Sequence, residues 1–213
     1  MRGTARPRRG RSDASRPYHH GNLRDALVEA ALQVLAETGT ESLTLREVAR
    51  RAGVSHAAPA HHFGDASGLV AAVAARGYRE LAAEMKRGAT ADSNPVVALR
   101  AAGLAYVEFA MRRPDLFRMM FHPAVADKSA FPELEEASGT TFDFLLARIT
   151  VCQHAGLVRP GDPRGLALSA WSTVHGLAVL AASDQLRAKG FREGIRRLGE
   201  NVTQDLFLGL RAP

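Results

Sequence analysis

The sequence predicts an all-α protein of about nine helices, in which an N-terminal three-helix unit with a helix-turn-helix is joined to a C-terminal helical bundle. Three observations indicate this fold class. Apolar residues recur with the 3.6-residue period of an amphipathic helix in every long segment. Capping residues and glycine or proline stops separate these segments. No segment shows the apolar–polar alternation of a half-buried strand.

The composition is typical of a soluble globular protein. Aliphatic and aromatic residues make up 46% of the 213 residues and charged residues 23%, which excludes disordered, collagen-like and membrane proteins. No run of 18 apolar residues occurs, so we expect no membrane-spanning helix. The single Cys152 excludes a disulfide framework and a cysteine-built zinc site. A cytoplasmic location fits these features, because the basic N-terminus lacks the apolar core of a secretory signal.

The net charge of +6 is concentrated at the N-terminus. Residues 1–24 contain seven arginines and one aspartate, so this segment carries the whole excess and the rest of the chain is neutral. We expect residues 1–17 to form a disordered basic arm, because they cannot bury enough apolar area to offset the entropy of ordering. Such an arm is drawn to phosphate, and its arginines can enter a minor groove. The alternative is an N-terminus that only keeps the chain soluble.

Capping signals define the first two helices. The first is expected to run from a capping Asn22 to a stop at Gly39. The second opens at Thr44, and Glu47 follows three residues later, a spacing typical of a capping box in which each side chain satisfies the other's free backbone N–H.

A glycine turn and a third short helix complete a helix-turn-helix. Gly53 can adopt the left-handed conformation of a sharp turn, and Ser55 is expected to cap the next helix. Pro59 then lacks the N–H that would bond to the Ser55 carbonyl, so we expect this helix to be short and tight. The second helix of such a pair can enter a major groove.

Several histidines raise the question of a metal site. Five of the eight lie close to the helix-turn-helix, at His19, His20, His56, His61 and His62. Asp65 follows His61 at helical spacing, but the glycine at position 64 should break the helix and leave Asp65 as a cap. We therefore expect no metal ligands here.

The rest of the chain is predicted to be an amphipathic bundle. The expected helices cover 65–88, 95–113, 115–121, 133–154, 163–183 and 191–210. The segment TADSNP at 90–95 separates the first of these helices from the others, and its Asn94 is expected to cap the helix that follows.

Residues 22–70 resemble the N-terminal domain of TetR/AcrR-type transcriptional regulators. The resemblance rests on ETGTESLT after the first helix, LREVARRAGVS in the helix-turn-helix, HHF at 61–63 and the following Leu69. It implies a DNA-binding domain at 18–66 and a ligand-binding and dimerisation domain at 67–213. The chain departs from the family pattern at Pro59-Ala60, where many members have a Leu-Tyr pair whose ring packs on the DNA backbone.

The resemblance assigns eight residues to DNA. It places Thr44 and Arg46 against the sugar-phosphate backbone and His61 and His62 near phosphates. The residues that it places toward the bases are Ser55, His56, Ala57 and Ala58. The chemistry agrees, because helix N-termini offer N–H groups to phosphate, histidine can donate to phosphate or contact a purine N7, and alanine suits a thymine methyl. The alternative for each histidine is an exposed polar position without a partner.

The last two helices suggest an interface. The last one carries an apolar stripe with Phe207 beside it, formed by Ile195, Leu198, Val202, Leu206 and Leu210. The preceding helix is rich in small residues from Ala167 to Ala182. Two such helices from each of two subunits can form a four-helix interface across a two-fold axis. The alternative is a stripe in the core of one chain, and the family resemblance favours the homodimer.

An aromatic set points to a ligand site. The sequence from Trp171 to Gly176 resembles the Trp/His-Gly signature of one branch of these regulators, and Trp171 and His175 share a helix face. The candidate ligand-binding residues are Tyr106, Phe109, Phe121, Phe142, Trp171 and His175. We expect a small, largely apolar effector with His175 as its polar anchor. The alternative is that the Trp and His are core residues with satisfied N–H groups.

Two other protein classes compete with this interpretation. Ser172 and His175 lie one turn apart, but the chain has no G-x-S-x-G elbow, no phosphate-binding glycine loop and no paired carboxylates. We therefore expect no enzyme activity and no cofactor. An architectural or ligand-independent DNA-binding protein would leave the aromatic bundle without a task. The sequence predicts a cytoplasmic homodimeric regulator, a repressor that an effector releases from a palindromic operator.

Overall fold

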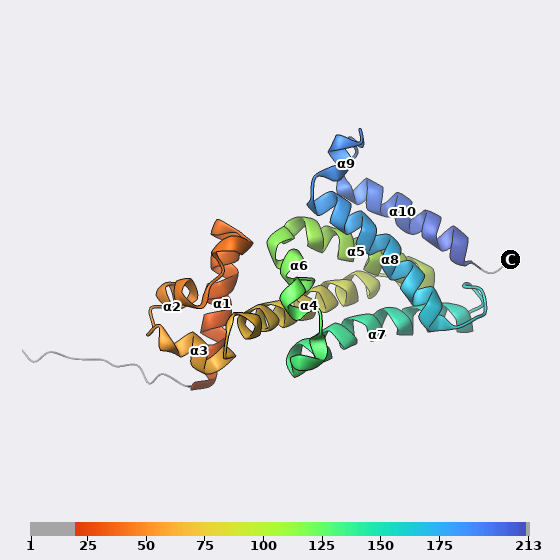
Figure 1. Cartoon of the computed structure of the whole chain (residues 1–213). Helices are drawn as coiled ribbons and strands as arrows, with labels where there is room; N and C mark the ends of the chain where they lie inside the picture. Colours follow the sequence, from red (N-terminus) through yellow and green to blue (C-terminus); the bar gives the residue numbers. More distant parts are fainter. Residues whose placement is uncertain (1–19, 212–213) are drawn as a thin grey trace, which may run out of the picture.

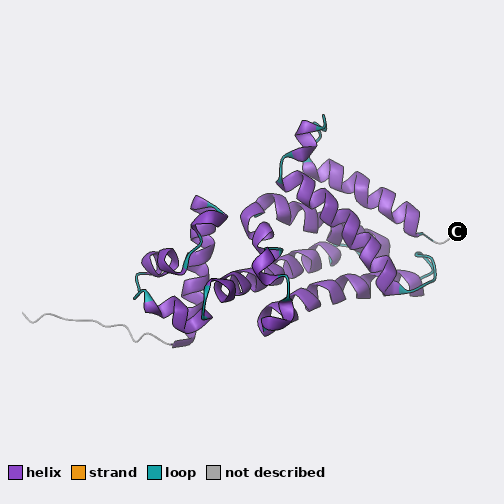
Figure 2. Ribbon diagram, in the orientation of Figure 1, coloured by secondary structure: helices purple, strands orange, loops and turns teal. Residues whose placement is uncertain are grey.

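The structure is a computed structural model that describes residues 20–211. Within this range it contains ten α-helices, three short 3-10 helices and no strand (Figure 2). The predicted basic arm at 1–17 lies outside the described residues. The elements of the N-terminal unit are α1 (His20–Thr38), η1 (Thr40–Ser42), α2 (Leu45–Ala52) and α3 (Ala57–Phe63).

The remaining elements form the bundle. They are α4 (Ala66–Ala89), α5 (Pro95–Arg112), α6 (Pro114–Met120), η2 (Pro123–Val125), η3 (Lys128–Ala130), α7 (Pro132–His154), α8 (Pro163–Ala182), α9 (Gln185–Ala188) and α10 (Ile195–Leu210). Figure 1 shows the small unit at one end of the molecule and α4 running from it into the bundle.

The prediction for α1 is right at its end and wrong at its start. Gly39 has φ +78°, and the helix stops one residue before it, as expected. The helix already begins at His20, so Asn22 lies inside the first turn and is not its cap.

The capping box of α2 is only half formed. Thr44 Oγ1 accepts a hydrogen bond from the Glu47 N–H at 3.1 Å. The Glu47 carboxylate does not return the contact, because it accepts from Arg50 Nε at 2.8 Å and Nη2 at 2.6 Å instead. Gly53 has φ +68° and ends α2 in the left-handed conformation, as predicted.

The third helix starts two residues after the predicted cap. No side chain caps α3, and the Ser55 carbonyl accepts from the Ala58 N–H at 3.0 Å. Pro59 is therefore the third helical residue, where an N–H has no partner inside a helix in any case. The predicted loss of a hydrogen bond does not occur, and Pro59 is buried in the unit. The helix has seven residues, as short as expected.

Helix α4 connects the two parts of the chain. Gly64, with φ +76°, ends α3, and Asp65 Oδ1 accepts from the Gly68 N–H at 3.0 Å to cap α4. The helix has 24 residues and contacts α1 and α3 as well as α5, α6 and α7. One uninterrupted helix therefore belongs to both parts of the chain.

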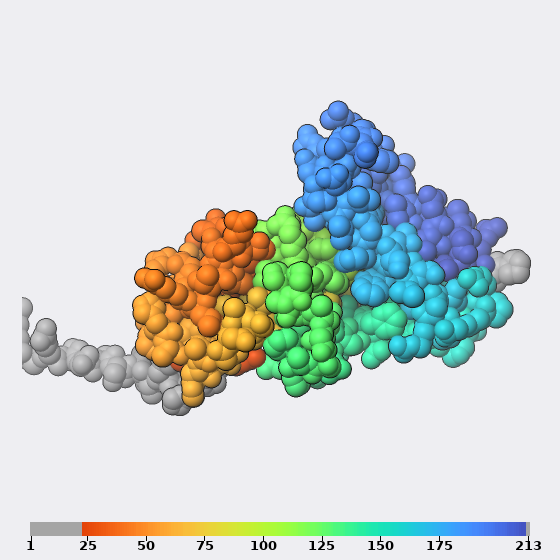
Figure 3. All heavy atoms as spheres, in the orientation of Figure 1, coloured from red at the N-terminus to blue at the C-terminus, as the bar shows by residue number. Residues whose placement is uncertain are grey.

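The C-terminal elements differ from prediction at one place. Asn94 caps α5 through bonds from the Val96 and Val97 N–H groups, as expected. The last helix, however, begins at Ile195 and not at Phe191, whose side chain is exposed. The short helix α9 precedes it and was not predicted. The segment around α9 projects from the bundle in the space-filling view (Figure 3).

The apolar stripe of α10 packs inside the chain. Leu198 and Leu210 are buried and Ile195, Val202 and Leu206 are partly buried, and α10 contacts α5 and α8. The stripe therefore belongs to the core, the alternative that the sequence left open. Burial removes Leu198 and Leu210 from any interface between two copies of the chain, whereas Ile195, Val202 and Leu206 keep part of their surface.

Helix α8 combines a buried side with an exposed apolar side. It has 20 residues, and an 18-residue window within it has a mean hydropathy of 1.4, which would suffice for a membrane span by length and composition alone. In the fold its buried residues, among them Leu166, Ala170 and Val174, pack toward α5, α7 and α10. Helix α8 is therefore a core helix of the bundle, and the side of α8 that faces away from the bundle is also apolar.

Candidate DNA-binding surface and effector cavity

The N-terminal unit presents most of its predicted DNA-binding residues to solvent. Six of them are exposed, namely Thr44, Arg46, Ser55, His56, Ala57 and His61. Ala58 and His62 are partly buried. Part of each of these two side chains packs against the protein, so less of its area is available to DNA than the sequence suggested.

Ion pairs distinguish the three arginines of α2. Arg50 is held by Glu47, and Arg51 Nη2 lies 2.6 Å from Glu37 Oε2. Arg46 forms no ion pair with any residue in the range 20–211. Its guanidinium is therefore the cation of α2 that is free to bind a phosphate.

The charge of the folded unit is negative. Residues 20–66 contain four arginines, no lysine and six carboxylates, a net charge of −2. The excess positive charge lies before this unit, in residues 1–19, which contain six arginines and one aspartate.

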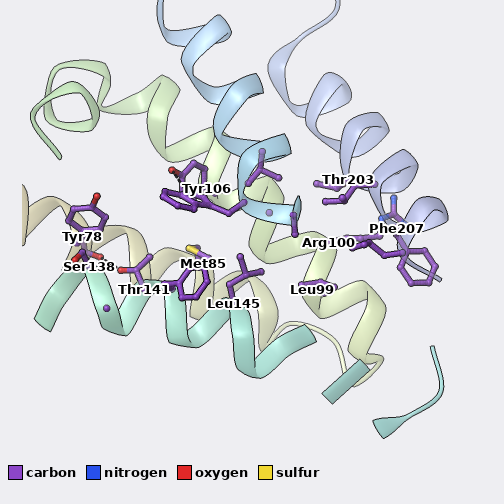
Figure 4. Close-up of a pocket in the computed structure, with 18 of the residues that line it drawn as sticks. Tyr78, Met85, Leu99, Arg100, Tyr106, Ser138, Thr141, Leu145, Thr203 and Phe207 are labelled. Atoms are coloured by element: carbon purple, nitrogen blue, oxygen red, sulfur yellow. Dashed lines mark hydrogen bonds between the residues drawn. The ribbon is translucent and has the colours of Figure 1, made fainter. Parts of the chain in front are cut away.

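The bundle encloses a cavity of about 270 Å³, close to the lower end of the roughly 300–1,000 Å³ of small-molecule sites. Side chains of α4, α5, α7, α8 and α10 form its wall (Figure 4). The aromatic and large apolar residues of the wall are Tyr78, Met85, Leu99, Tyr106, Phe142, Leu145, Trp171, Val174, Leu206, Phe207 and Leu210.

The structure places three of the six predicted ligand residues in this wall. Tyr106, Phe142 and Trp171 line the cavity. Phe109, Phe121 and His175 do not: Phe109 is fully buried in the core, and the rings of Phe121 and His175 pack on each other with centroids 4.5 Å apart.

Tyr106 joins Trp171 to His175. The Trp171 indole N–H donates to Tyr106 Oη at 3.3 Å, and Tyr106 Oη lies 2.8 Å from His175 Nδ1. Since the tyrosine hydroxyl accepts from the indole, its own hydrogen can donate to a neutral imidazole. His175 Nδ1 thus has its partner within the protein, and the residue does not line the cavity, so the structure does not place it as the polar anchor that the sequence suggested.

Burial fixes the protonation states of this group. It lowers the pKa of His175 below its ordinary value of 6.5 and raises the pKa of Tyr106. Both residues are therefore neutral at pH 7, in agreement with a hydrogen bond from Tyr106 to an unprotonated Nδ1.

Two cationic residues of the wall were missed by the sequence interpretation. Arg100 and Lys128 both line the cavity. Arg100 could have been found, because it is the one charged residue in the otherwise uncharged run from position 93 to 107. Lys128 could not, since nothing in the loop sequence indicates that it faces the bundle.

A helix-turn-helix unit on one end of a cavity-bearing helical bundle defines a class of two-domain DNA-binding transcriptional regulators. Comparison with known families agrees: the family described as bacterial regulatory proteins, tetR family, matches residues 27–73, and the tetracyclin repressor-like C-terminal domain matches residues 99–203. The chain belongs to the TetR family, and it is a DNA-binding transcriptional regulator.

Individual relatives extend this comparison. An uncharacterized HTH-type transcriptional regulator of Mycobacterium tuberculosis is 28% identical over 158 residues, which is 72% of this chain and 81% of the relative. The regulator BetI of Burkholderia mallei is 39% identical over 79 residues, 37% of this chain and 40% of its own.

Solved structures show the same fold. A protein of unknown function from Rhodococcus sp. RHA1 is 33% identical, with a TM-score of 0.78 over 93% of this chain and all of the other. A TetR-family regulator of Pectobacterium atrosepticum is 22% identical, with a TM-score of 0.71 over 91% of this chain and 96% of its own.

Proposed function

We propose that this regulator is a homodimeric repressor that binds a palindromic operator and leaves it when a small molecule occupies the cavity. The observation that carries the proposal is that α4 belongs both to the packing of the DNA-binding unit and to the cavity wall. Its first turns pack on α1 and α3, and its later turns contribute Tyr78 and Met85 to the cavity wall. A ligand in the cavity therefore touches the helix that positions the DNA-binding unit.

The exposed residues support one arrangement of the unit on DNA. Helix α3 is short and presents Ser55, His56 and Ala57 at its start, where they can contact base edges in a major groove. Arg46 and the free N–H groups at the start of α2 then face the phosphates. The unit is proposed to read bases with α3 and to position itself with α2.

A second copy of the chain is proposed to cover the outer side of α8. Leu168, Ser172, Gly176 and Leu180 follow one another at four-residue spacing, and all four are exposed. A Cβ added at Gly176 would meet no atom of residues 20–211 within 4 Å. Such a face of small and apolar residues suits close packing on its two-fold mate. This face belongs to the first of the two helices that the sequence predicts at the interface.

Linkage explains the release from DNA. An effector that binds more tightly when the two recognition helices are wrongly spaced lowers operator affinity, and DNA lowers effector affinity by the same factor. The proposal includes no catalytic role, since Ser172 is exposed and His175 Nδ1 is already bound to Tyr106. A protein that acts on bacterial DNA is proposed to work in the cytoplasm.

Selection of DNA from a random pool by the purified full-length protein tests the proposal. We expect a selected site with dyad symmetry, bound by a dimer whose recognition helices meet major grooves about 34–36 Å apart. Sites without symmetry, or DNA binding by a monomer, would contradict it. A screen of small molecules for release of that site from the protein tests the effector role.

Two variants sharpen the test. His56→Ala is expected to relax base preference at one or two positions of each half-site, at a cost of about 1–3 kcal/mol. Arg187→Ala changes an exposed residue of α9, far along the chain from the DNA-binding unit, and should leave operator binding unchanged. If both variants bind alike, α3 does not read the bases.

A further inference from the structure

The hydroxyl groups in the cavity wall offer no free hydrogen to a ligand. Each of them already lies within hydrogen-bond distance of an acceptor in the protein. Tyr78 donates to the Met120 carbonyl (3.3 Å), Ser138 to that of Glu135 (3.1 Å), Thr141 to that of Ala137 (2.9 Å) and Thr203 to that of Gly199 (2.8 Å). Tyr106 is held between Trp171 and His175. A ligand group that accepts hydrogen bonds must therefore find its donor elsewhere.

Arg100 is such a partner. Its Nε is buried without a hydrogen-bond partner among residues 20–211. No carboxylate of residues 20–211 lines the cavity, and the ion pairs within this range do not include Arg100. A buried guanidinium N–H without an acceptor in a mostly apolar wall is costly, and no group among residues 20–211 supplies an acceptor for this Nε.

The position of Arg100 sets the orientation of a ligand. Arg100 lies beside Phe207 at one end of the cavity, and Tyr78 and Ser138 lie at the other end (Figure 4). The second cation, Lys128, has its Nζ 5.8 Å from the centre of the Tyr78 ring, where the π face offers partial compensation. A ligand with one polar end therefore places that end at Arg100 and its apolar part along the wall.

We propose that the effector is an organic acid with an apolar body, whose carboxylate binds the guanidinium of Arg100. This inference rests on the proposed role of the cavity as an effector site. A carboxylate can accept two parallel N–H bonds from a guanidinium and neutralises its charge. A neutral apolar molecule leaves Arg100 unpaired, and a cation is repelled by Arg100 and Lys128. The acid keeps the largely apolar body that the sequence predicts and adds a carboxylate to it.

Trp171 provides a direct readout of binding. It is the only tryptophan of the chain, and it lines the cavity. Its fluorescence can be followed in the full-length protein without DNA while matched pairs of ligands are titrated. The probes are decanoate with decan-1-ol, 4-phenylbutyrate with 4-phenylbutan-1-ol, and 4-cyclohexylbutyrate with 4-cyclohexylbutan-1-ol.

We expect at least one of these acids to bind about tenfold or more tightly than its alcohol, because hydrogen bonds to charged groups are stronger than neutral ones. Arg100→Gln should remove this preference and leave the affinity for the alcohols unchanged. Arg148→Gln is the matched control: Arg148 also has a buried Nε without a partner among residues 20–211, but it does not line the cavity. This variant should keep the preference.

Two results would overturn the proposal. One is that no acid binds more tightly than its alcohol, and the other is that Arg100→Gln binds the acid as tightly as the unaltered protein. If alcohols still bind in either case, the cavity remains a ligand site and only the acid is wrong. If neither acids nor alcohols bind, the cavity itself fails as an effector site, and release from operator DNA then tests the remainder of the proposed function.

Discussion

The Tyr106 hydroxyl satisfies two side chains of α8 at once. Replacing it in Tyr106→Phe leaves the Trp171 N–H and His175 Nδ1 without their partner. We expect a loss of about 1–3 kcal/mol in the free energy of unfolding, measured by urea denaturation. Tyr78→Phe is the control, since that hydroxyl makes only one bond of 3.3 Å. Equal losses in the two variants would show that the two hydrogen bonds of the Tyr106 hydroxyl contribute no more to stability than the single bond of Tyr78.

His175 gives the protein a pH-dependent contribution to stability. Burial lowers its pKa below 6.5 in the folded chain, so the unfolded chain takes up the proton at the higher pH. The free energy of unfolding therefore decreases as the pH falls through 6.5 toward the folded pKa, and it loses nothing from this group above 6.5. Urea denaturation at pH 7.5 and 5.5 should show a smaller decrease in His175→Asn. An identical decrease would contradict the assignment.

For individual side chains, the sequence predicted which residues share a helix face better than it predicted what each residue does. The 3.6-residue period showed that Trp171 and His175 share a face, and the structure places them together. It could not show that Tyr106, 69 positions before His175, takes up the imidazole nitrogen. It also could not show which side of α5 carries Arg100 toward the cavity, because that depends on the packing of α5 against α10.

The junction between α3 and α4 depends on a glycine. A Cβ added at Gly68, in the first turn of α4, would overlap the backbone carbonyl of Phe63. Because a backbone atom cannot rotate away, α3 and α4 must move apart in Gly68→Ala. We expect a loss of about 1–3 kcal/mol in the free energy of unfolding together with weaker operator binding.

Gly139→Ala is the control for this prediction. A Cβ at Gly139 meets no atom of the described chain within 4 Å, and the residue lies inside α7. Alanine there should stabilise the protein by about 0.5–1 kcal/mol. If both variants shift stability in the same direction, the contact at Phe63 does not limit the junction.

Element boundaries were predictable where a local signal sets them. Gly39, Gly53, Asp65, Asn94 and the proline at position 163 mark ends or starts that the structure confirms. The signals failed where tertiary packing decides. Asn22 does not cap α1, because the helix already begins at His20. Helix α9 has only four residues, too few to show a helical period.

The outer face of α8 predicts how two whole molecules meet. Leu180 is 47% exposed, and in a two-fold interface each substitution counts twice. Leu180→Glu should weaken the dimer by about 3–6 kcal/mol, giving monomers in size-exclusion chromatography with light scattering. Met111→Glu on α5 changes a residue of similar exposure, 39%, and should stay dimeric. A dimeric Leu180→Glu variant would place the interface elsewhere.

Charge distribution over the whole chain predicts a separate role for the N-terminal arm. The folded unit at 20–66 has a net charge of −2, so its attraction to DNA depends on the arginines before it. Deletion of residues 2–16 removes six of them. We expect weaker binding to all DNA sequences and a log–log salt dependence that is shallower by roughly 0.9 for each phosphate that the arm no longer neutralises.

Full-length variants separate the charge of the arm from its length. Changing the six arginines to glutamine should reproduce the deletion, whereas changing them to lysine should keep the salt dependence, because counterion release follows charge. Base preference should change little in either variant, since phosphate contacts carry no direct sequence information. Salt titrations on the selected operator and on an unrelated duplex measure both effects. An unchanged salt dependence in the glutamine variant would mean that the arm does not contact phosphates, and that Arg46 and the N-termini of α2 and α3 bind DNA against the negative charge of their own unit.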